Sequence, residues 1–145
     1  MSTDPRYTPE TFNAFGAHYL PGYLGIEITR VAEAEVAARL EIRPHLLAPN
    51  GYLHAGSVVT LADTAAGYAC VANLPEGAAS FTTIELKSNH LGTARDGFIE
   101  CVAKAVHLGR TTQVWDVVVA NSANGKTIAL FRCTQMILYP TKDDE

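Results

Sequence analysis

The sequence predicts an α+β fold in which an antiparallel sheet curls around one long apolar helix. Apolar residues recur at helical spacing over residues 55–73, and this stretch holds a single acidic or basic side chain. The segments on both sides alternate between apolar and polar residues, which is typical of strands. The later strands follow one another directly, so we expect antiparallel pairing. A sheet curled round one apolar helix would bury it on most sides.

The N-terminal segment, residues 1–22, is predicted to be helical. Thr8 is a good N-cap, and Pro9 suits the first position of a helix. We expect this helix to run to about Tyr19 and to end before the Pro-Gly pair at 21–22.

Strands are predicted where β-forming residues or alternation recur, over residues 25–29, 36–42, 80–86, 98–106, 111–119 and 126–139. Pro49-Asn50-Gly51 marks a turn before the central helix. Asn124-Gly125 predicts a type I′ hairpin. Residues 140–145 are expected to be a frayed tail, and the chain of 145 residues is interpreted as one domain.

The central helix is predicted to bury one stripe and to leave its only carboxylate beside that stripe. The core stripe consists of Val58, Leu61, Ala62, Ala65 and Ala69. Asp63 lies off the stripe, among Val59, Ala66, Gly67 and Cys70. These neighbours are small, so either a second chain approaches the helix there or the helix packs tightly on its own sheet.

Composition narrows the class of protein. A net charge of −4 without a Lys/Arg cluster argues against nucleic acid or an anionic membrane as the main partner. The cysteines Cys70, Cys101 and Cys133 are odd in number and form no CxxC motif, so neither a disulfide framework nor a zinc site is expected. We find neither a signal-peptide pattern nor an apolar run long enough to span a bilayer. A cytoplasmic protein is expected.

The most informative residues are His54, at the mouth of the central helix, and Asp63 inside it. A helix mouth offers free N–H groups and a partial positive charge, which can hold an oxyanion. The two residues are nine positions apart, which places them about half a turn out of phase and about 13 Å apart along the axis. If they share a site, it needs two copies of the chain. Asp63 as a capped or solvated residue, and His54 as a turn histidine, remain the alternatives.

Three motifs resemble a known family. They are His54-Ala55-Gly56 with Asp63, residues 83–91 (TIELKSNHL) and residues 107–112 (HLGRTT). In these, and in the order of its elements, the chain resembles the hotdog-fold acyl-CoA thioesterases of the phenylacetate-pathway (PaaI-like) type, over residues 40–139.

The resemblance implies hydrolysis of an acyl- or aryl-CoA thioester to the free acid and CoA. Asp63 corresponds to the family's catalytic carboxylate, acting as nucleophile or as general base, and His54 to the histidine beside the thioester. The backbone N–H of Ala55, with Gly56 next to it, corresponds to the oxyanion donor. The family's carboxylate faces the helix mouth of a neighbouring subunit, so a homo-oligomer, a dimer with shared sites and further a tetramer, is expected. No metal or other cofactor is needed.

The chain departs from the family pattern at three positions. Ala55 replaces the first Gly of the usual His-Gly-Gly. Ala48 stands where many relatives have Asn or Gln, and Asn50, two places later, is the candidate substitute. Gly67 stands where some relatives carry Ser or Thr to orient water, so Thr64 is the candidate for that role.

Other side chains are candidates for holding the substrate. Asn89 and His90 join Asn50, Thr64 and Gly67 as predicted substrate-binding residues. Aromatic side chains could line an aryl pocket, and these are Tyr52, Tyr68, Phe81 and His90. Lys87, Arg95 and Arg110 are the candidates for binding the phosphates of CoA, although each could equally be a solvated surface charge.

Two other functions fit parts of the sequence. A hotdog dehydratase or hydratase also pairs a histidine with a carboxylate, and His45 lies upstream of the helix, but the Pro-Gly-rich turn of those enzymes is missing. A non-catalytic acyl-CoA-binding protein would not need a desolvated acid at Asp63.

Overall fold

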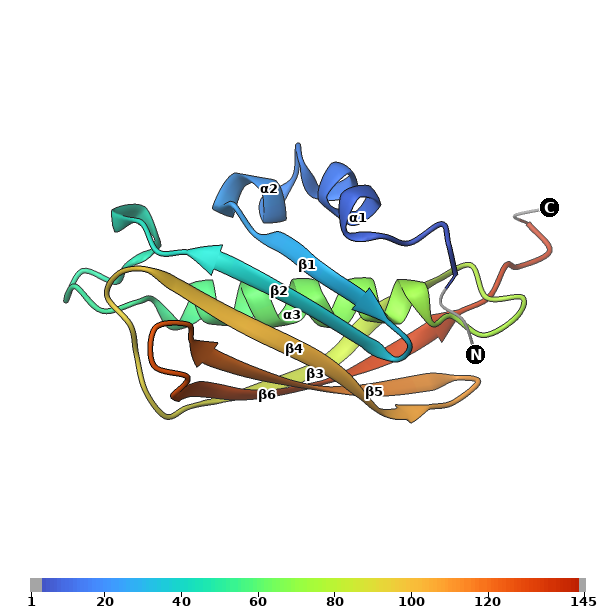
Figure 1. Cartoon of the computed structure of the whole chain (residues 1–145). Coiled ribbons are helices and arrows are strands. Elements are labelled where there is room, and N and C mark those ends of the chain that lie inside the picture. Colours follow the sequence, from blue (N-terminus) through green and yellow to red (C-terminus); the bar gives the residue numbers. More distant parts are fainter. Residues whose placement is uncertain (1–3, 144–145) are drawn as a thin grey trace.

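The computed structural model describes residues 4–143 and contains one antiparallel sheet wrapped around one long helix (Figure 1). The elements are α1 (Pro9–Gly16), α2 (Leu20–Leu24), β1 (Glu27–Ala32), β2 (Glu35–Glu41), the 3-10 turn η1 (Pro44–Leu46), α3 (Ala55–Ala72), β3 (Ser80–His90), β4 (Phe98–Leu108), β5 (Thr112–Asn121) and β6 (Thr127–Leu138). The six strands are ordered β1-β2-β4-β5-β6-β3, and all neighbours are antiparallel. The predicted fold class is confirmed.

The N-terminal segment folds differently from the prediction. Thr8 caps α1 as expected, because its Oγ1 accepts from the Thr11 N–H at 3.1 Å while its own N–H donates to Thr11 Oγ1 at 2.8 Å. However, α1 ends at Gly16, and the Pro-Gly pair lies inside the separate helix α2. Proline fits there because the first helical turn needs no N–H from it.

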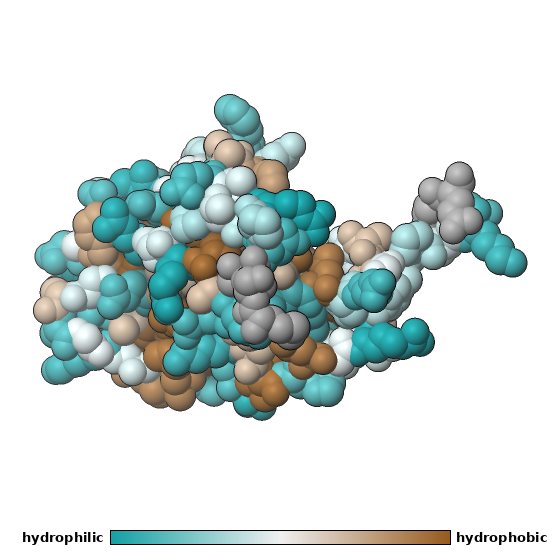
Figure 2. All heavy atoms as spheres, turned by 45° about the vertical axis from the view of Figure 1, so that its right-hand side comes forward, coloured by the Kyte–Doolittle hydropathy of each residue, from teal (hydrophilic) through white to brown (hydrophobic). Residues whose placement is uncertain are grey.

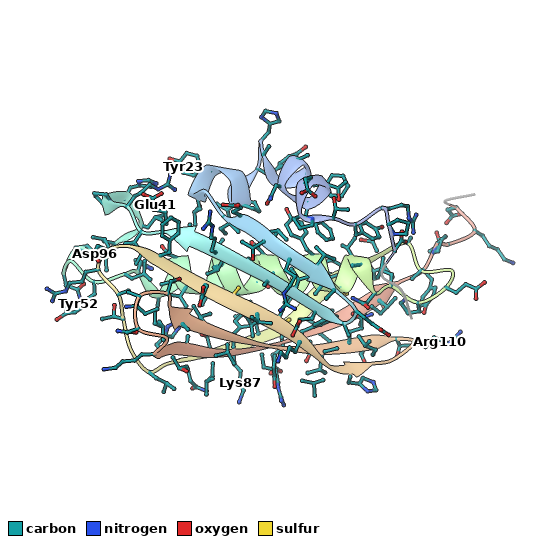
Figure 3. The ribbon with its side chains drawn as sticks, in the orientation of Figure 1. Tyr23, Glu41, Tyr52, Lys87, Asp96 and Arg110 are labelled. Atoms are coloured by element: carbon teal, nitrogen blue, oxygen red, sulfur yellow. The ribbon has the colours of Figure 1, made fainter. Side chains whose placement is uncertain are left out.

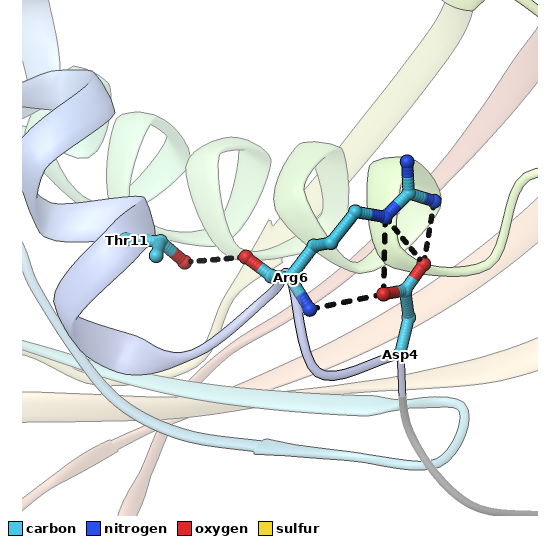
Figure 4. A network of polar contacts seen from close by, with 3 residues as sticks. All are labelled: Asp4, Arg6 and Thr11. Carbon is cyan, nitrogen blue, oxygen red and sulfur yellow. Dashed lines mark hydrogen bonds and ion pairs between the residues drawn. The ribbon is translucent and has the colours of Figure 1, made fainter.

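The start of the chain is tied to α1 by a small polar network (Figure 4). The Arg6 guanidinium forms an ion pair with Asp4 at 2.6 Å, and the Arg6 carbonyl accepts from Thr11 Oγ1 at 3.1 Å. Residues 1–3 of the predicted helical segment lie outside the described residues.

Helix α3 matches the prediction closely but buries a wider arc. Ala66 and Cys70 are fully buried along with the expected stripe, so they contact the chain's own sheet and are not free to meet a second chain. Only Val59, Asp63 and Gly67 of that face remain partly exposed. By length and composition alone α3 also meets the minimum for a membrane span, contrary to our expectation, although a buried core helix passes the same test.

The largest differences from the predicted strands are at the end of β3 and in the β5–β6 connection, while β1 lies two to three residues later than predicted. β3 continues to His90, four residues beyond the predicted end, because residues 87–90 still pair with β6. The β5–β6 connection is not a type I′ turn, because only Gly125 (φ 72°), and not Asn124, has the positive φ that such a turn needs at both positions. It is a five-residue loop, residues 122–126, in which the Gly125 N–H donates to the Asn121 carbonyl at 2.8 Å. Of the predicted tail, residues 140–143 form no helix or strand, and 144–145 lie outside the described residues.

The two edge strands of the sheet, β1 and β3, differ in whether another part of the chain covers them. At β1, the Asn13 side chain bonds both the N–H and the carbonyl of Ile28, at 2.8 and 3.1 Å, so α1 covers that edge. At β3, nothing in residues 4–143 pairs with the outer edge. Ile84 and Leu86 of this strand are 54% and 43% exposed. β3 is therefore an open edge with apolar side chains, a typical site of strand pairing between chains.

The core lies between α3 and the sheet. Its largest fully buried side chains include Trp115, Phe12, Leu40 and Ile99. Trp115 Nε1 donates to Gln113 Oε1 at 2.9 Å, and Gln113 Nε2 donates to the Asn73 carbonyl at 2.8 Å, which fixes the C-terminal end of α3 on β5. Elsewhere, apolar patches interrupt a mostly polar surface at the end where the termini lie (Figure 2).

Candidate active site

The mouth of α3 is organised by His54. Its backbone is extended, and its Nδ1 accepts a hydrogen bond from the Gly56 N–H at 2.8 Å. Its carbonyl accepts from the N–H groups of Ser57 and Val58 at 3.0 and 3.4 Å. Within residues 4–143, the N–H of Ala55 is the one donor of this first turn that has no hydrogen-bond acceptor. One free donor therefore remains at the helix mouth, and it belongs to the residue predicted to hold the oxyanion.

The same contact fixes the imidazole tautomer. Since Nδ1 accepts, a neutral His54 carries its proton on Nε2 and presents a donor. Two bonds to the Leu46 carbonyl anchor the mouth, from the His54 N–H at 3.1 Å and from Ser57 Oγ at 2.9 Å. Residues 54–56 are exposed, so both free donors can reach a ligand.

Asp63 lies about two and a half helical turns after His54 along α3, and its side chain is partly buried. Its Oδ1 is buried and has no hydrogen-bond partner in residues 4–143. Burial raises the pKa of this carboxyl. Burial also raises the pKa of the Cys133 thiol to about 12, and the nearby Asp63 and Cys70 add to the shift. Asp63 is therefore neither capped nor freely solvated, and an unpaired buried acid is a candidate functional group.

A narrow apolar strip surrounds Asp63 where α3 meets β3. We call it the α3–β3 seam, formed by Val59, Asp63 and Gly67 of α3 with Phe81 and Leu86 of β3. Phe81 and Leu86 face α3, because they pair with Ile137 and Cys133, whose side chains are buried against the helix. A Cβ built on Gly67 would lie 3.3 Å from Cζ of Phe81. The seam faces the open β3 edge and is not closed by the chain itself.

Asn50 is occupied by its own turn. Its Oδ1 accepts from the Tyr52 N–H at 3.1 Å, and the Gly51 N–H donates to the Ala48 carbonyl at 2.9 Å. Thr64 is partly buried next to Asp63 on α3. The Asn50 Nδ2 group is not used by this turn, so the roles predicted for Asn50 and Thr64 stay predictions.

The predicted substrate and CoA residues on β3 lie on both faces of the sheet. His90 pairs with the buried Ala129 and so faces the helix side. Lys87 and Asn89 pair with the exposed Arg132 and Leu130, and they line a hollow of about 340 Å³ on the opposite, outer face. Lys87 accordingly projects away from the helix in Figure 3.

The three basic candidates do not gather in one protomer. The Arg95 guanidinium stacks 4.3 Å from the Tyr52 ring, close to the helix mouth. Arg110 lies at the opposite end of the molecule from Tyr52 (Figure 3), and its guanidinium is 6.0 Å from the Tyr139 ring. Arg95 is the only one of the three near His54 in the same chain.

The aromatic candidates separate in the same way. Tyr68 stacks on Phe12 at 4.6 Å, and its hydroxyl approaches Gly16, so it joins α1 to α3 and does not line a pocket. The ring of Tyr52 is covered by the guanidinium of Arg95. Phe81 is the one that lies beside the helical turn after Asp63.

Sequence reasoning missed two buried polar groups on the strands under α3. Ser88 Oγ and the side-chain amide of Gln135 are buried without a hydrogen-bond partner in the described chain. In an alternating strand every second residue faces the core, and a polar residue at one of these core-facing positions would have indicated both groups. No group of three His, Cys, Asp or Glu side chains within residues 4–143 is placed to hold a metal ion.

Comparison with known proteins decides the family. Residues 50–128, which span the helix mouth, Asp63 and strands β3, β4 and β5, match the family model of the thioesterase superfamily. The chain belongs to the thioesterase superfamily. The resemblance to hotdog-fold acyl-CoA thioesterases is confirmed, and this thioesterase hydrolyses acyl-CoA thioesters.

Individual relatives of this thioesterase support the same family assignment. It is 31% identical over 136 residues to 1,4-dihydroxy-2-naphthoyl-CoA hydrolase of Escherichia coli, covering 92% of this chain and 96% of that one. It is 32% identical over 111 residues to the enzyme of the same name from Listeria monocytogenes, covering 77% and 89%. A mutant thioesterase from Pseudomonas aeruginosa superposes with a TM-score of 0.89 at 28% identity, over 97% of this chain and 100% of that one. The Escherichia coli PaaI protein superposes with a TM-score of 0.75 at 27% identity, over 83% and 85%.

Proposed function

We propose that this thioesterase cleaves its substrate at a site shared between two copies of the chain, with Asp63 of one copy facing the helix mouth of the other. The observation that carries the proposal is the buried Oδ1 of Asp63, which has no partner in residues 4–143. Within one chain, Ala55 lies about 12 Å from Asp63 along the helix at 1.5 Å per residue. Only a second helix mouth can therefore meet this carboxylate.

The oxyanion would be held by two donors from the mouth of α3. The Ala55 N–H is free because the neighbouring Gly56 N–H is held by His54 Nδ1. His54 Nε2–H is the second donor, since Nδ1 is already an acceptor. Donors aimed at a developing oxyanion stabilise the transition state more than the ground state, and one such donor contributes about 2.7–4 kcal/mol.

Asp63 would act in one of two ways that give the same products. As a nucleophile, its carboxylate oxygen bonds to the carbonyl carbon, the C–S bond breaks, CoA leaves as the thiolate, and water then hydrolyses the anhydride. As a general base, it takes a proton from water, the new hydroxide bonds to the carbon, and the proton passes to the departing thiolate. In both routes water is consumed, and no further cofactor takes part.

The His54 geometry favours hydrolysis over the dehydratase alternative. A histidine that acts as a base needs a free lone pair facing the substrate. In this chain the ring nitrogen that accepts is turned into the helix, and the outward nitrogen carries the proton. A binding protein without catalysis is disfavoured because an unpaired buried carboxylate destabilises the fold.

The dimer would form through β3. The β1 edge is covered by α1, whereas β3 offers an open edge with Ile84 and Leu86 exposed. Antiparallel pairing of two β3 strands would set the two α3 helices side by side in opposite directions, which brings each helix mouth toward the other Asp63. A tetramer could then form through the outer face of the sheet, where Val118 and Leu130 are exposed beside the Asp116–Arg132 ion pair.

The substrate is proposed to be an aryl-CoA thioester, in line with the hydrolases that the chain resembles. Arg95, which stacks on Tyr52, is the candidate contact for a CoA phosphate and belongs to the chain that supplies the helix mouth. Lys87 and Arg110 could contact the phosphates only from another protomer. The proposal includes a cytoplasmic location, which the three free, buried cysteines support.

A thiol-release assay tests the proposal. Pure protein is mixed with benzoyl-, acetyl- and palmitoyl-CoA in the presence of a thiol reagent. We expect release of free CoA by the wild-type protein and not by Asp63→Asn. Crotonyl-CoA is included as a fourth substrate because its double bond can take up water. Hydration of this double bond without thiol release would instead identify a hydratase or dehydratase, and binding without either change would identify a binding protein.

A further inference from the structure

Phe81 occupies an unusual position for a large aromatic side chain on the helix side of the sheet. It lies in the α3–β3 seam and stays partly exposed, while its partner Ile137 on β6 is buried. The buried core cluster and the partly buried residues that pack against it include Tyr68, Val59 and Val71, but not Phe81. The ring therefore forms a wall beside the helix, where another group can touch it.

The Phe81 ring can lie this close to α3 because residue 67 is a glycine and has no side chain. Residue 67 lies one helical turn after Asp63 on the same face, about 6 Å along the axis. Cζ of Phe81 reaches to 3.3 Å from the point where a Cβ of residue 67 would stand. Such a separation is tighter than ordinary van der Waals contact, so any larger residue at 67 would push the ring away. Gly67 and Phe81 are complementary in shape.

Beyond the contact between Gly67 and Phe81, the interior of the protein is closely packed. Ala66 and Cys70, which flank Gly67 on the inner side of α3, are fully buried, and Trp115 fills the core beneath the helix. An acyl group whose carbonyl carbon lies at Asp63 therefore has about one helical turn of free length before it meets the Phe81 ring. A flat ring can stack or meet edge-on against Phe81 in that space. A long unbranched chain cannot continue straight past the ring, because the packed core lies beyond it, and would have to bend away toward the β3 edge.

We propose that Phe81, seated against Gly67, closes the acyl pocket one turn beyond Asp63 and selects compact, flat acyl groups over long chains. This inference rests on the proposed site at Asp63. Phe81 acts on specificity and touches only the acyl group, so it takes no part in bond breaking. Gly67 is a positioning residue, because it acts through the ring that it admits.

The test compares kcat/KM for benzoyl-CoA and palmitoyl-CoA in wild type, Phe81→Leu and Phe81→Ala. We expect wild type to prefer benzoyl-CoA. Shortening the ring should raise the palmitoyl-to-benzoyl ratio by about tenfold or more, the scale of discrimination by a few apolar groups in a pocket. Most of the change should be in KM and little in the kcat for benzoyl-CoA, because Asp63 and the helix mouth are untouched.

Tyr68→Leu is the matched control, because it removes an aromatic ring from the adjacent position that packs on Phe12. It should lower stability and leave the ratio of the two substrates within about twofold of wild type. Gly67→Ala adds a methyl group on the helix that displaces the Phe81 ring, so it should lower kcat/KM for benzoyl-CoA more than for acetyl-CoA. This variant also tests the inference if Phe81→Ala folds poorly.

An unchanged ratio in Phe81→Leu, or an equal change in Tyr68→Leu, would overturn the inference while leaving the site at Asp63 intact. Full activity of Asp63→Asn on benzoyl-CoA would instead overturn the site itself, so the two failures are distinguishable.

Discussion

The Nδ1 atom of His54 accepts a hydrogen bond from the backbone N–H of Gly56 at 2.8 Å. This contact makes one side chain both the N-cap of α3 and a fixed donor at Nε2. It also removes the Gly56 N–H from the set of groups that could bind an oxyanion. Stability and catalysis are therefore linked at His54 and can be separated by choosing the substitution.

His54→Asn should keep the cap and lose the donor. Asparagine is a strong N-cap, so the free energy of unfolding should stay close to wild type, whereas His54→Ala should lose about 1 kcal/mol. Both variants lack the Nε2 donor, and kcat should fall by about 10²-fold in each. Thermal unfolding and thiol release measure the two effects. Equal stability of the two variants would show that the cap contributes nothing, and wild-type turnover in His54→Asn would show that the donor does not act.

Ala55 should act through its backbone alone. Ala55→Gly keeps the N–H and should change kcat by less than about tenfold, with any loss due to added backbone freedom. Ala55→Pro removes a donor that has no partner within residues 4–143, and proline is tolerated at the first helical position, so the fold should survive. Its kcat should fall by about 10²–10³. Normal turnover in a folded Ala55→Pro protein would place the oxyanion elsewhere.

Asp63→Asn should lower kcat by at least about 100-fold, the scale of losing a general base. The same change should stabilise the protein near neutral pH. Burial raises the pKa of Asp63 above its usual value of 3.8, so the folded chain holds this proton more tightly than the unfolded chain does. The ionised side chain then destabilises the fold above its folded pKa, and the penalty fades as the pH falls through that value.

The stability difference between Asp63→Asn and wild type should therefore be largest at about pH 7–8 and close to zero near about pH 4. Thermal unfolding across this range, with an exposed control such as Asp143→Asn, provides the measurement. A difference that grows as the pH falls would have the wrong sign for a carboxyl with a raised pKa.

The outcome at β3 shows what sequence patterning can and cannot provide. The strands, α3 and the isolation of Asp63 were predictable because periodicity and charge are local properties. The faces occupied by Lys87 and Asn89 were not, because a bulge between Thr83 and Glu85 inserts one residue and reverses the alternation. Without it, both side chains would share the helix side with Phe81.

The cap at His54 and the ring contact at Gly67 were unpredictable for a different reason. The first depends on a side-chain rotamer, which composition does not encode. The second joins α3 to β3 across the loop at residues 73–79, so it needs the tertiary packing. The helix over Pro21 was missed because the same Pro-Gly pair can end one helix or lie within the start of the next.

Ile84→Lys should weaken the proposed β3 pairing. A lysine on an open edge strand opposes pairing with another chain, so the dissociation constant should rise by about tenfold or more. Activity should fall at concentrations at which the dimer dissociates. Leu20→Lys is the matched control, since Leu20 is also exposed but lies on α2. Sedimentation at assay concentration gives the oligomeric state, and a fully active monomer would contradict shared sites.

The most direct test of the account mixes two inactive variants, Asp63→Asn and Ala55→Pro, by unfolding and refolding them together. Each variant alone should show the losses given above. In a mixed dimer, Asp63 of the Ala55→Pro chain faces the intact helix mouth of the Asp63→Asn chain, so one of its two sites is complete. Random pairing of equal amounts predicts recovery of about a quarter of wild-type activity. Activity that stays at the level of the separate variants, although the mixed dimer is shown to form, would contradict a site shared between chains.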